Sequence, residues 1–341
     1  MYITFLIGNG FDINIGLHTR YSDFYKFFVK NARVSNMIRN WIVEEEHLWS
    51  DLELRLGQKI SEVNKETLDQ FYEDKIELDS LLVEYLETEQ KRFEIFKNNQ
   101  SVIEKEFVRS IMEFTEGFTV VDGNFIKEIK ETYRSEIFEY QFITFNYTDV
   151  LTKIVNSCKR SNSDVGSHAN ETGGRLVDKL GMVHHIHGTV GGEAILGVND
   201  VSQINNEFLC SESTFQETFI KRQANEYLGQ EKTKRAQEII SKSKIICIFG
   251  MSIGSTDQMW WEELVNWLLS STIKKLVIFW KGNETELERT IPTRVILLKK
   301  KIIKDFLDKG KGKHSEEEVE KIQNQIIVMF NSKIFSFPKV K

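Results

Sequence analysis

Short runs of β-branched and aromatic residues recur along the chain, and at least four of them stop at glycine, asparagine or histidine. Short apolar runs bounded by turn residues are typical of buried strands. In open parallel α/β sheets, ligands bind outside the carboxyl ends of the strands. The pattern therefore predicts an α/β fold with a Rossmann-like parallel sheet and a binding site at its strand ends. The predicted strands cover residues 2–7, 142–145, about 181–187, 245–249 and 276–280, with strand-like runs again in 325–337.

Between the first two predicted strands the hydrophobic pattern changes its period. Residues 21–42 look helical, and from about 44 to 138 Glu and Lys are dense while proline is absent. Apolar residues there recur at spacings of three and four, as in Leu78, Leu81 and Leu82. This spacing predicts several long amphipathic helices.

These patterns give a domain organisation. We expect a Rossmann-like core formed by residues 1–43 and 139–341, and a large helical insertion formed by residues 44–138. Within the core, residues 156–179 are polar and contain several glycines, so we expect a loop there.

Composition narrows the class of protein. The net charge of −6 argues against a protein whose whole surface binds nucleic acid. The three cysteines are scattered along the chain, which does not suit a disulfide framework or a four-thiolate zinc site. The N-terminus lacks the basic and small-residue features of a signal peptide, and no run of about 18 uncharged apolar residues predicts a membrane span. We therefore expect a cytoplasmic protein without a membrane partner.

The first candidate motif follows the first predicted strand and contains Gly8, Asn9, Gly10 and Asp12. Glycine lets the backbone approach a phosphate closely, and N–H groups that open a helix can bind the anion. Ile13 stands where the dinucleotide fingerprint G-x-G-x-x-G has its third glycine, so a plain tight turn is an equal alternative.

The second motif, at the end of another predicted strand, contains Asn146 and Asp149. The amide of Asn146 offers both a donor and an acceptor, which suits a ribose hydroxyl or a water molecule. Asp149 could accept from hydroxyl groups, but an N-cap on the following helix is its more ordinary role.

The third motif is the histidine cluster His184, His185 and His187. Alternation along a strand places His185 and His187 on one face and His184 on the other. A histidine at a strand end can act as a general base, because its ordinary pKa of about 6.5 lies near neutrality. A two-histidine metal site is a lesser alternative because no carboxylate or cysteine has matching spacing, so we expect no metal.

The fourth motif begins at Gly250 and includes Ser252 and Gly254. Small residues and hydroxyls at a strand end suit contacts to ribose or phosphate. The spacing also matches the hydrolase pattern G-x-S-x-G. A hydrolase would need its histidine after Ser252, however, and only His314 follows it, so we set the serine hydrolase aside.

Taken in order, the motifs resemble those of the sirtuin-type NAD fold, and over most of the length the chain resembles the bacteriophage abortive infection AbiH proteins. The blocks that match the sirtuin pattern are Gly8–Gly10, Gly16-Leu17 with Asp23-Phe24, Thr144–Asn146 with Asp149, His187-Gly188 and Gly250–Ser252. The blocks that match the AbiH pattern are 7–12, 21–24, 49–53, 144–147, 185–188 and 249–252.

The resemblance implies an antiphage effector that hydrolyses NAD to nicotinamide and ADP-ribose. His187 would be the general base, and Asn146 would position the attacking water. The remaining motif residues, which would line the dinucleotide site, are Gly8, Asn9, Gly10, Asp12, Asp149, Gly250 and Ser252. Protein deacetylation is not implied, because deacetylating sirtuins carry a four-cysteine zinc module that this chain lacks.

Two other functions stay open on the sequence alone. The pocket could hold NAD, ADP-ribose or another nucleotide as a sensor without cleaving it. A nucleic-acid-cleaving enzyme would suit antiphage defence, but the acidic charge and the lack of a clustered carboxylate metal motif weigh against it. We expect a nucleotide as ligand and a phage-derived trigger as partner. The helical insertion is the natural place for sensing, restraint or assembly into a homo-oligomer.

Overall fold

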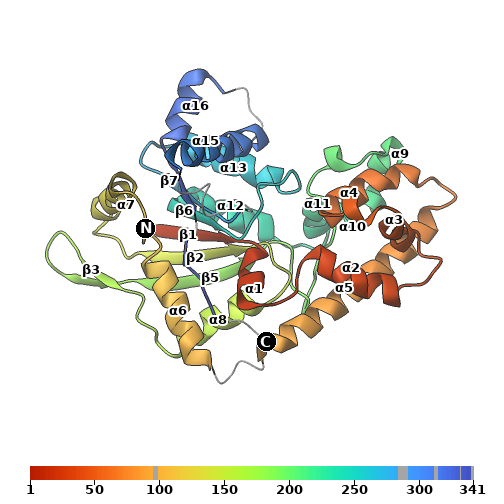
Figure 1. The fold of residues 1–341 in the computed structure, drawn as a ribbon, viewed down its shortest axis with the longest axis horizontal. Coiled ribbons are helices and arrows are strands. Elements are labelled where there is room, and N and C mark those ends of the chain that lie inside the picture. Colours follow the sequence, from red (N-terminus) through yellow and green to blue (C-terminus); the bar gives the residue numbers. More distant parts are fainter. Residues whose placement is uncertain (95–98, 283–290, 311–313, 331, 339–341) are drawn as a thin grey trace.

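The computed structural model describes residues 1–94, 99–282, 291–310, 314–330 and 332–338. Its centre is a parallel sheet of six strands in the order β5-β2-β1-β6-β7-β8 (Figure 1). The prediction of a Rossmann-like parallel sheet is confirmed. The strands are β1 (Tyr2–Ile7), β2 (Glu139–Thr144), β5 (Lys179–His185), β6 (Ser243–Phe249), β7 (Lys275–Trp280) and β8 (Ile326–Phe330).

Helices cover both faces of the sheet, as buried parallel strands require. Alternate residues of β1 face opposite ways: Ile3 and Phe5 pack in one hydrophobic cluster, whereas Leu6 packs in the other. The first face is covered by α1 (Gly10–Ile15), α6 (Gln100–Met112), α7 (Val120–Thr132) and α8 (Val150–Arg160). The second face is covered by α12 (Lys232–Lys242), α13 (Gln258–Leu269), α15 (Pro292–Lys309) and α16 (Glu316–Gln323).

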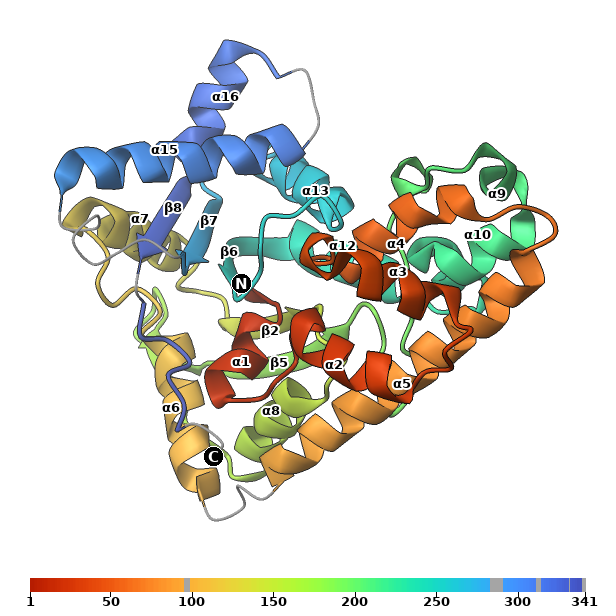
Figure 2. The ribbon, with the colours of Figure 1, turned by 45° about the vertical axis from the view of Figure 1, so that its right-hand side comes forward.

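A third hydrophobic cluster lies beside the sheet, in what we call the helical lobe (Figure 2). This lobe brings together two segments that are far apart in sequence, because Phe24 and Trp49 pack in the same cluster as Phe215 and Phe219. Its helices are α2 (Tyr21–Asn31), α3 (Met37–Glu45), α4 (Leu52–Lys59), α5 (Leu68–Glu94), α9 (Glu207–Ser211), α10 (Ser213–Phe219) and α11 (Lys221–Tyr227).

Residues 44–138 are helical, as the period indicates, but they divide between two cores. The helices α4 and α5 belong to the helical lobe, whereas Phe107 of α6 and Ile129 of α7 pack on the sheet. The pattern of one helix shows which of its faces is buried but not which surface covers that face.

Two other segments differ in detail from the predictions. The stretch 156–179 contains the end of α8 and an antiparallel hairpin of β3 (Ser167–Ala169) and β4 (Arg175–Val177). The helical stretch 21–42 is two helices, because the chain leaves α2 at Ala32 and restarts after Asn36, whose side chain accepts from the N–H of Arg39.

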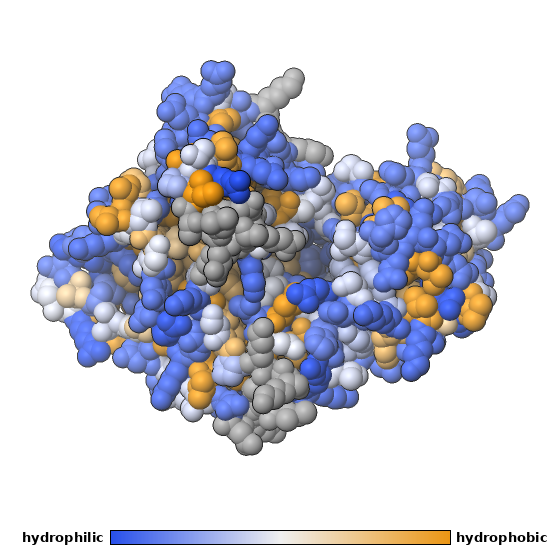
Figure 3. All heavy atoms as spheres, in the orientation of Figure 1, coloured by the Kyte–Doolittle hydropathy of each residue, from blue (hydrophilic) through white to orange (hydrophobic). Residues whose placement is uncertain are grey.

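Among the described residues, no helix is long and apolar enough to cross a membrane. The face of the molecule in Figure 3 is largely hydrophilic, with hydrophobic side chains scattered over it.

Candidate functional site

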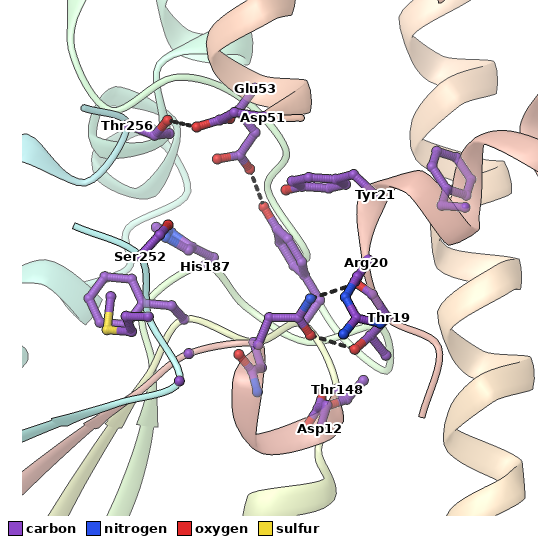
Figure 4. Close-up of a pocket in the computed structure, with 18 of the residues that line it drawn as sticks. Asp12, Thr19, Arg20, Tyr21, Asp51, Glu53, Thr148, His187, Ser252 and Thr256 are labelled. Carbon is purple, nitrogen blue, oxygen red and sulfur yellow. Dashed lines mark hydrogen bonds between the residues drawn. The ribbon is translucent and has the colours of Figure 1, made fainter. Parts of the chain in front are cut away.

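A cavity of about 440 Å³ lies where the sheet meets the helical lobe (Figure 4). It opens beside β1 and β6, the neighbouring strands at which the chain reverses its direction of crossing the sheet. In open α/β sheets this reversal point is where ligands bind. Of the residues predicted for the site, Gly8, Asn9, Asp12, Asn146, His187, Gly250 and Ser252 line the cavity, whereas Gly10 and Asp149 do not.

The glycines at the carboxyl ends of these two strands hold the turns after β1 and β6 against each other. The N–H of Gly8 donates to Phe249 O at 2.9 Å, and the N–H of Gly10 donates to Gly250 O at 2.8 Å. A Cβ on Gly10 would lie 2.5 Å from Gly250 Cα, so a side chain does not fit there. The observed role of these glycines is close backbone packing, and a contact between them and a phosphate stays a prediction.

Asn9 connects the first turn to the entrance of the helical lobe. Its amide donates to Thr19 O at 2.8 Å, and its side-chain oxygen accepts from the Thr19 hydroxyl. The segment that precedes α2 is thereby held against the turn that follows β1.

Asn146 and Asp12 form a buried polar pair in the cavity wall. Asn146 is 7 % exposed, and neither polar atom of its side chain has a hydrogen-bond partner of ordinary geometry. Burial raises the pKa of Asp12 to about 7, although the Thr148 hydroxyl, 2.6 Å from Oδ2, and the nearby Asn146 amide favour the charged carboxylate. Buried polar groups usually have partners, so an unpartnered amide in a cavity wall indicates a ligand or ordered water.

His187 lies between aromatic rings in the same wall. Its ring centroid is 5.6 Å from that of Phe145 and 6.1 Å from that of Tyr147, and its Nε2 is 3.9 Å from Oδ1 of Asp257. Burial, helped by the charge of Lys221, holds the pKa of His187 well below its usual 6.5. The ring is therefore neutral at neutral pH, and its Nδ1 has no hydrogen-bond partner among the described residues.

The other predicted residues of these two motifs lie outside the cavity wall. Because β5 ends at His185, strand alternation does not fix the direction of His187, and the His185 ring instead contacts the Thr152 hydroxyl of α8. Asp149 is the N-cap residue of α8, yet its side chain makes no capping bond and pairs with Lys153 at 3.1 Å.

Ser252 lines the cavity without the geometry of a hydrolase nucleophile. The Nδ1 atom of His187 has no hydrogen-bond partner among the described residues and its Nε2 faces Asp257, while α13 begins only at Gln258. A nucleophile elbow instead turns directly from strand into helix.

Sequence reasoning missed a charged cluster at the lobe side of the cavity. Oε2 of Glu53 accepts from Lys221 at 2.6 Å, and its Oε1 accepts from the Tyr147 hydroxyl at 2.7 Å. Asp51 caps α4 and accepts from the Thr256 hydroxyl of the loop after β6. Asp51 and Glu53 stand in a block that carries the family resemblance, but nothing local marks Lys221.

Among the described residues, no group of three or more His, Cys, Asp or Glu side chains is placed to hold a metal ion. The sequence model of the family described as bacteriophage abortive infection AbiH matches residues 4–280, which include the whole cavity wall. The chain belongs to this AbiH family. AbiH membership indicates a role in phage abortive-infection defence. No curated protein and no solved structure matches this AbiH chain.

Proposed function

We propose that the cavity binds NAD or a close relative and hydrolyses its bond between nicotinamide and ribose, so that activation during infection depletes the nucleotide. The observation that carries the proposal is the buried, unpartnered amide of Asn146 in a cavity that His187 also lines. The strand order, the position of the cavity and the resemblance of these motifs to the sirtuin pattern support it.

In the proposed reaction, Asn146 holds the attacking water beside the anomeric carbon of the ribose. As the carbon–nitrogen bond breaks, nicotinamide leaves with the bonding electron pair and the ribose becomes oxocarbenium-like. The water oxygen forms the new bond to carbon, and its proton passes to the neutral His187 ring. Asp257 lies 3.9 Å from Nε2 and would stabilise the imidazolium formed. NAD and water thus give nicotinamide, ADP-ribose and a proton.

The test is incubation of the purified full chain with NAD, with nicotinamide and ADP-ribose followed by chromatography. His187→Ala and Asn146→Ala should abolish release, whereas the control His47→Ala, which changes an exposed histidine away from the cavity, should not. Release that persists in His187→Ala would contradict the assigned base. Saturable NAD binding without release would overturn the hydrolase and leave a nucleotide sensor.

A further inference from the structure

The helix α2 begins at the cavity. Thr19, Arg20, Tyr21 and Ser22 line the cavity, and α2 continues for 11 residues from Tyr21. The N–H groups of Asp23 and Phe24 donate to Arg20 O at 3.0 and 3.1 Å. The N–H groups of Tyr21 and Ser22 have no hydrogen-bond partner within the described part of the chain, and no side chain caps the helix. Free N–H groups and the helix dipole favour a bound anion at such an end.

Arg20 adds a cation at the same place. Its side chain is exposed, and no carboxylate of the described residues lies within ion-pair distance of it. Three other arginines of the helical lobe are already paired, Arg33 with Glu77, Arg55 with Glu45, and Arg92 with Glu89, and Arg39 donates to Val29 O away from the cavity. The Arg20 guanidinium is therefore available for a phosphate, which it can bind through two parallel hydrogen bonds.

An independent observation points to a ligand in the cavity. Asn146 lines it, is more than nine-tenths buried, and neither polar atom of its side chain has a hydrogen-bond partner of ordinary geometry among the described residues. The two bonds between Asn9 and Thr19 hold the residue before Arg20 against the turn after β1. The helix end and the backbone of Arg20 are therefore held next to the carboxyl end of β1.

Of the acidic side chains of the cavity that Figure 4 labels, Asp51 and Glu53 lie away from Arg20. Asp12 lies on the side of Thr19 and accepts from the Thr148 hydroxyl at 2.6 Å. Figure 4 shows Asp51 and Glu53 on one side of the Tyr21 ring and Arg20 with Thr19 on the other. Glu53 is neutralised by Lys221 at 2.6 Å. The cavity thus has one end suited to an anion and a wall suited to hydroxyl groups.

We infer that Arg20 and the first N–H groups of α2 bind the phosphate groups of the ligand, whose ribose reaches Asn146 and His187. This inference rests on the proposed nucleotide-binding function and assigns its phosphate subsite. The glycine turn after β1 is not needed for that contact, because the N–H groups of Gly8 and Gly10 already donate to backbone carbonyls.

The test is isothermal titration calorimetry of the full chain with three probes: ADP-ribose, inorganic pyrophosphate and nicotinamide riboside, which carries no phosphate. Arg20→Gln should weaken ADP-ribose and pyrophosphate by about ten-fold or more, because a hydrogen bond to a charged group contributes about 1.5–3 kcal/mol. Its affinity for nicotinamide riboside should stay that of the unaltered protein. The control Arg222→Gln changes an exposed arginine of α11 that does not line the cavity.

The outcomes separate this inference from the proposed function. ADP-ribose that binds Arg20→Gln as tightly as the unaltered protein would overturn the phosphate subsite and keep the nucleotide site. Pyrophosphate binding that depends on Arg20, without ADP-ribose binding, would support the anion site and overturn the NAD site. Failure of both phosphate probes to bind the unaltered protein would overturn the inference.

Discussion

Lys221 Nζ donates a hydrogen bond of 2.6 Å to Oε2 of Glu53, across 168 positions of sequence. Their side chains are 3 % and 6 % exposed, so the two charges are buried together. Since Tyr147 also donates to Glu53, the pair connects α4 and α11 of the helical lobe to the loop after β2. The charge pair therefore fixes how the lobe closes the cavity.

Removal of one partner should destabilise the fold strongly. Lys221→Met leaves the Glu53 carboxylate buried without its cation, which costs about 3–5 kcal/mol of unfolding free energy. The double variant Lys221→Met/Glu53→Gln should recover part of the loss, because no unpaired charge remains. Urea unfolding measures both, with Lys159→Met, at an exposed position, as control. A single variant as stable as the control would show that the pair does not hold the lobe.

Gly250→Ala should lower the unfolding free energy by more than the strain of a left-handed alanine alone would. Gly250 has a φ of +69°, and a Cβ there would lie 2.8 Å from Gly10 Cα. Gly173→Ala is the matched control, because Gly173 has a φ of +83° with open space around its Cβ position. Left-handed backbone costs about 1–2 kcal/mol in each, and the clash should roughly double the loss at Gly250. Equal melting temperatures would show that the two turns separate at no cost.

Asp12 should make stability fall as pH rises. Burial raises its pKa from 3.8 to about 7, so between these values the folded protein binds a proton that the unfolded chain has released. The unfolding free energy then decreases from about pH 4 to pH 7, by at most about 4 kcal/mol at about 1.4 kcal/mol per pKa unit. Asp12→Asn should remove this contribution to the pH dependence, and its side-chain oxygen can still accept from Thr148.

Urea unfolding at pH 5 and pH 8 measures the difference. The control Asp308→Asn, at an exposed aspartate, should keep the slope of the unaltered protein. If Asp12→Asn has that same slope, the Asp12 carboxyl does not titrate in this window.

Asn146→Ala should lose function without losing stability. A buried amide with no partner costs the folded protein about 1–3 kcal/mol of desolvation, so its removal offsets the loss of packing. We expect a melting temperature equal to or above that of the unaltered protein, measured by calorimetry without ligand, together with loss of NAD binding or turnover. A large fall in melting temperature would instead identify Asn146 as a structural residue.

The local sequence determined much of what lies at the carboxyl ends of the strands. A buried strand needs a short apolar run, and a tight turn needs glycine, so the ends of β1, β2 and β6 could be located from composition. Asn146 was singled out because it directly follows the apolar run 142–145, and His187 because it ends the predicted strand 181–187 beside glycine. Which strands are neighbours, and hence that Gly10 packs on Gly250, depends on contacts between segments 240 positions apart.

The tertiary structure alone decided the rest of the cavity. Arg20 directly precedes α2 and Lys221 begins α11, two helices whose local patterns are ordinary, and no spacing relates Lys221 to Glu53. They meet because Phe24 and Trp49 share a hydrophobic cluster with Phe215. The sequence by itself determines which faces are apolar and where strands end, because those are local properties. Which apolar face covers which is settled by packing over the whole chain, and that packing placed the charged residues of the site.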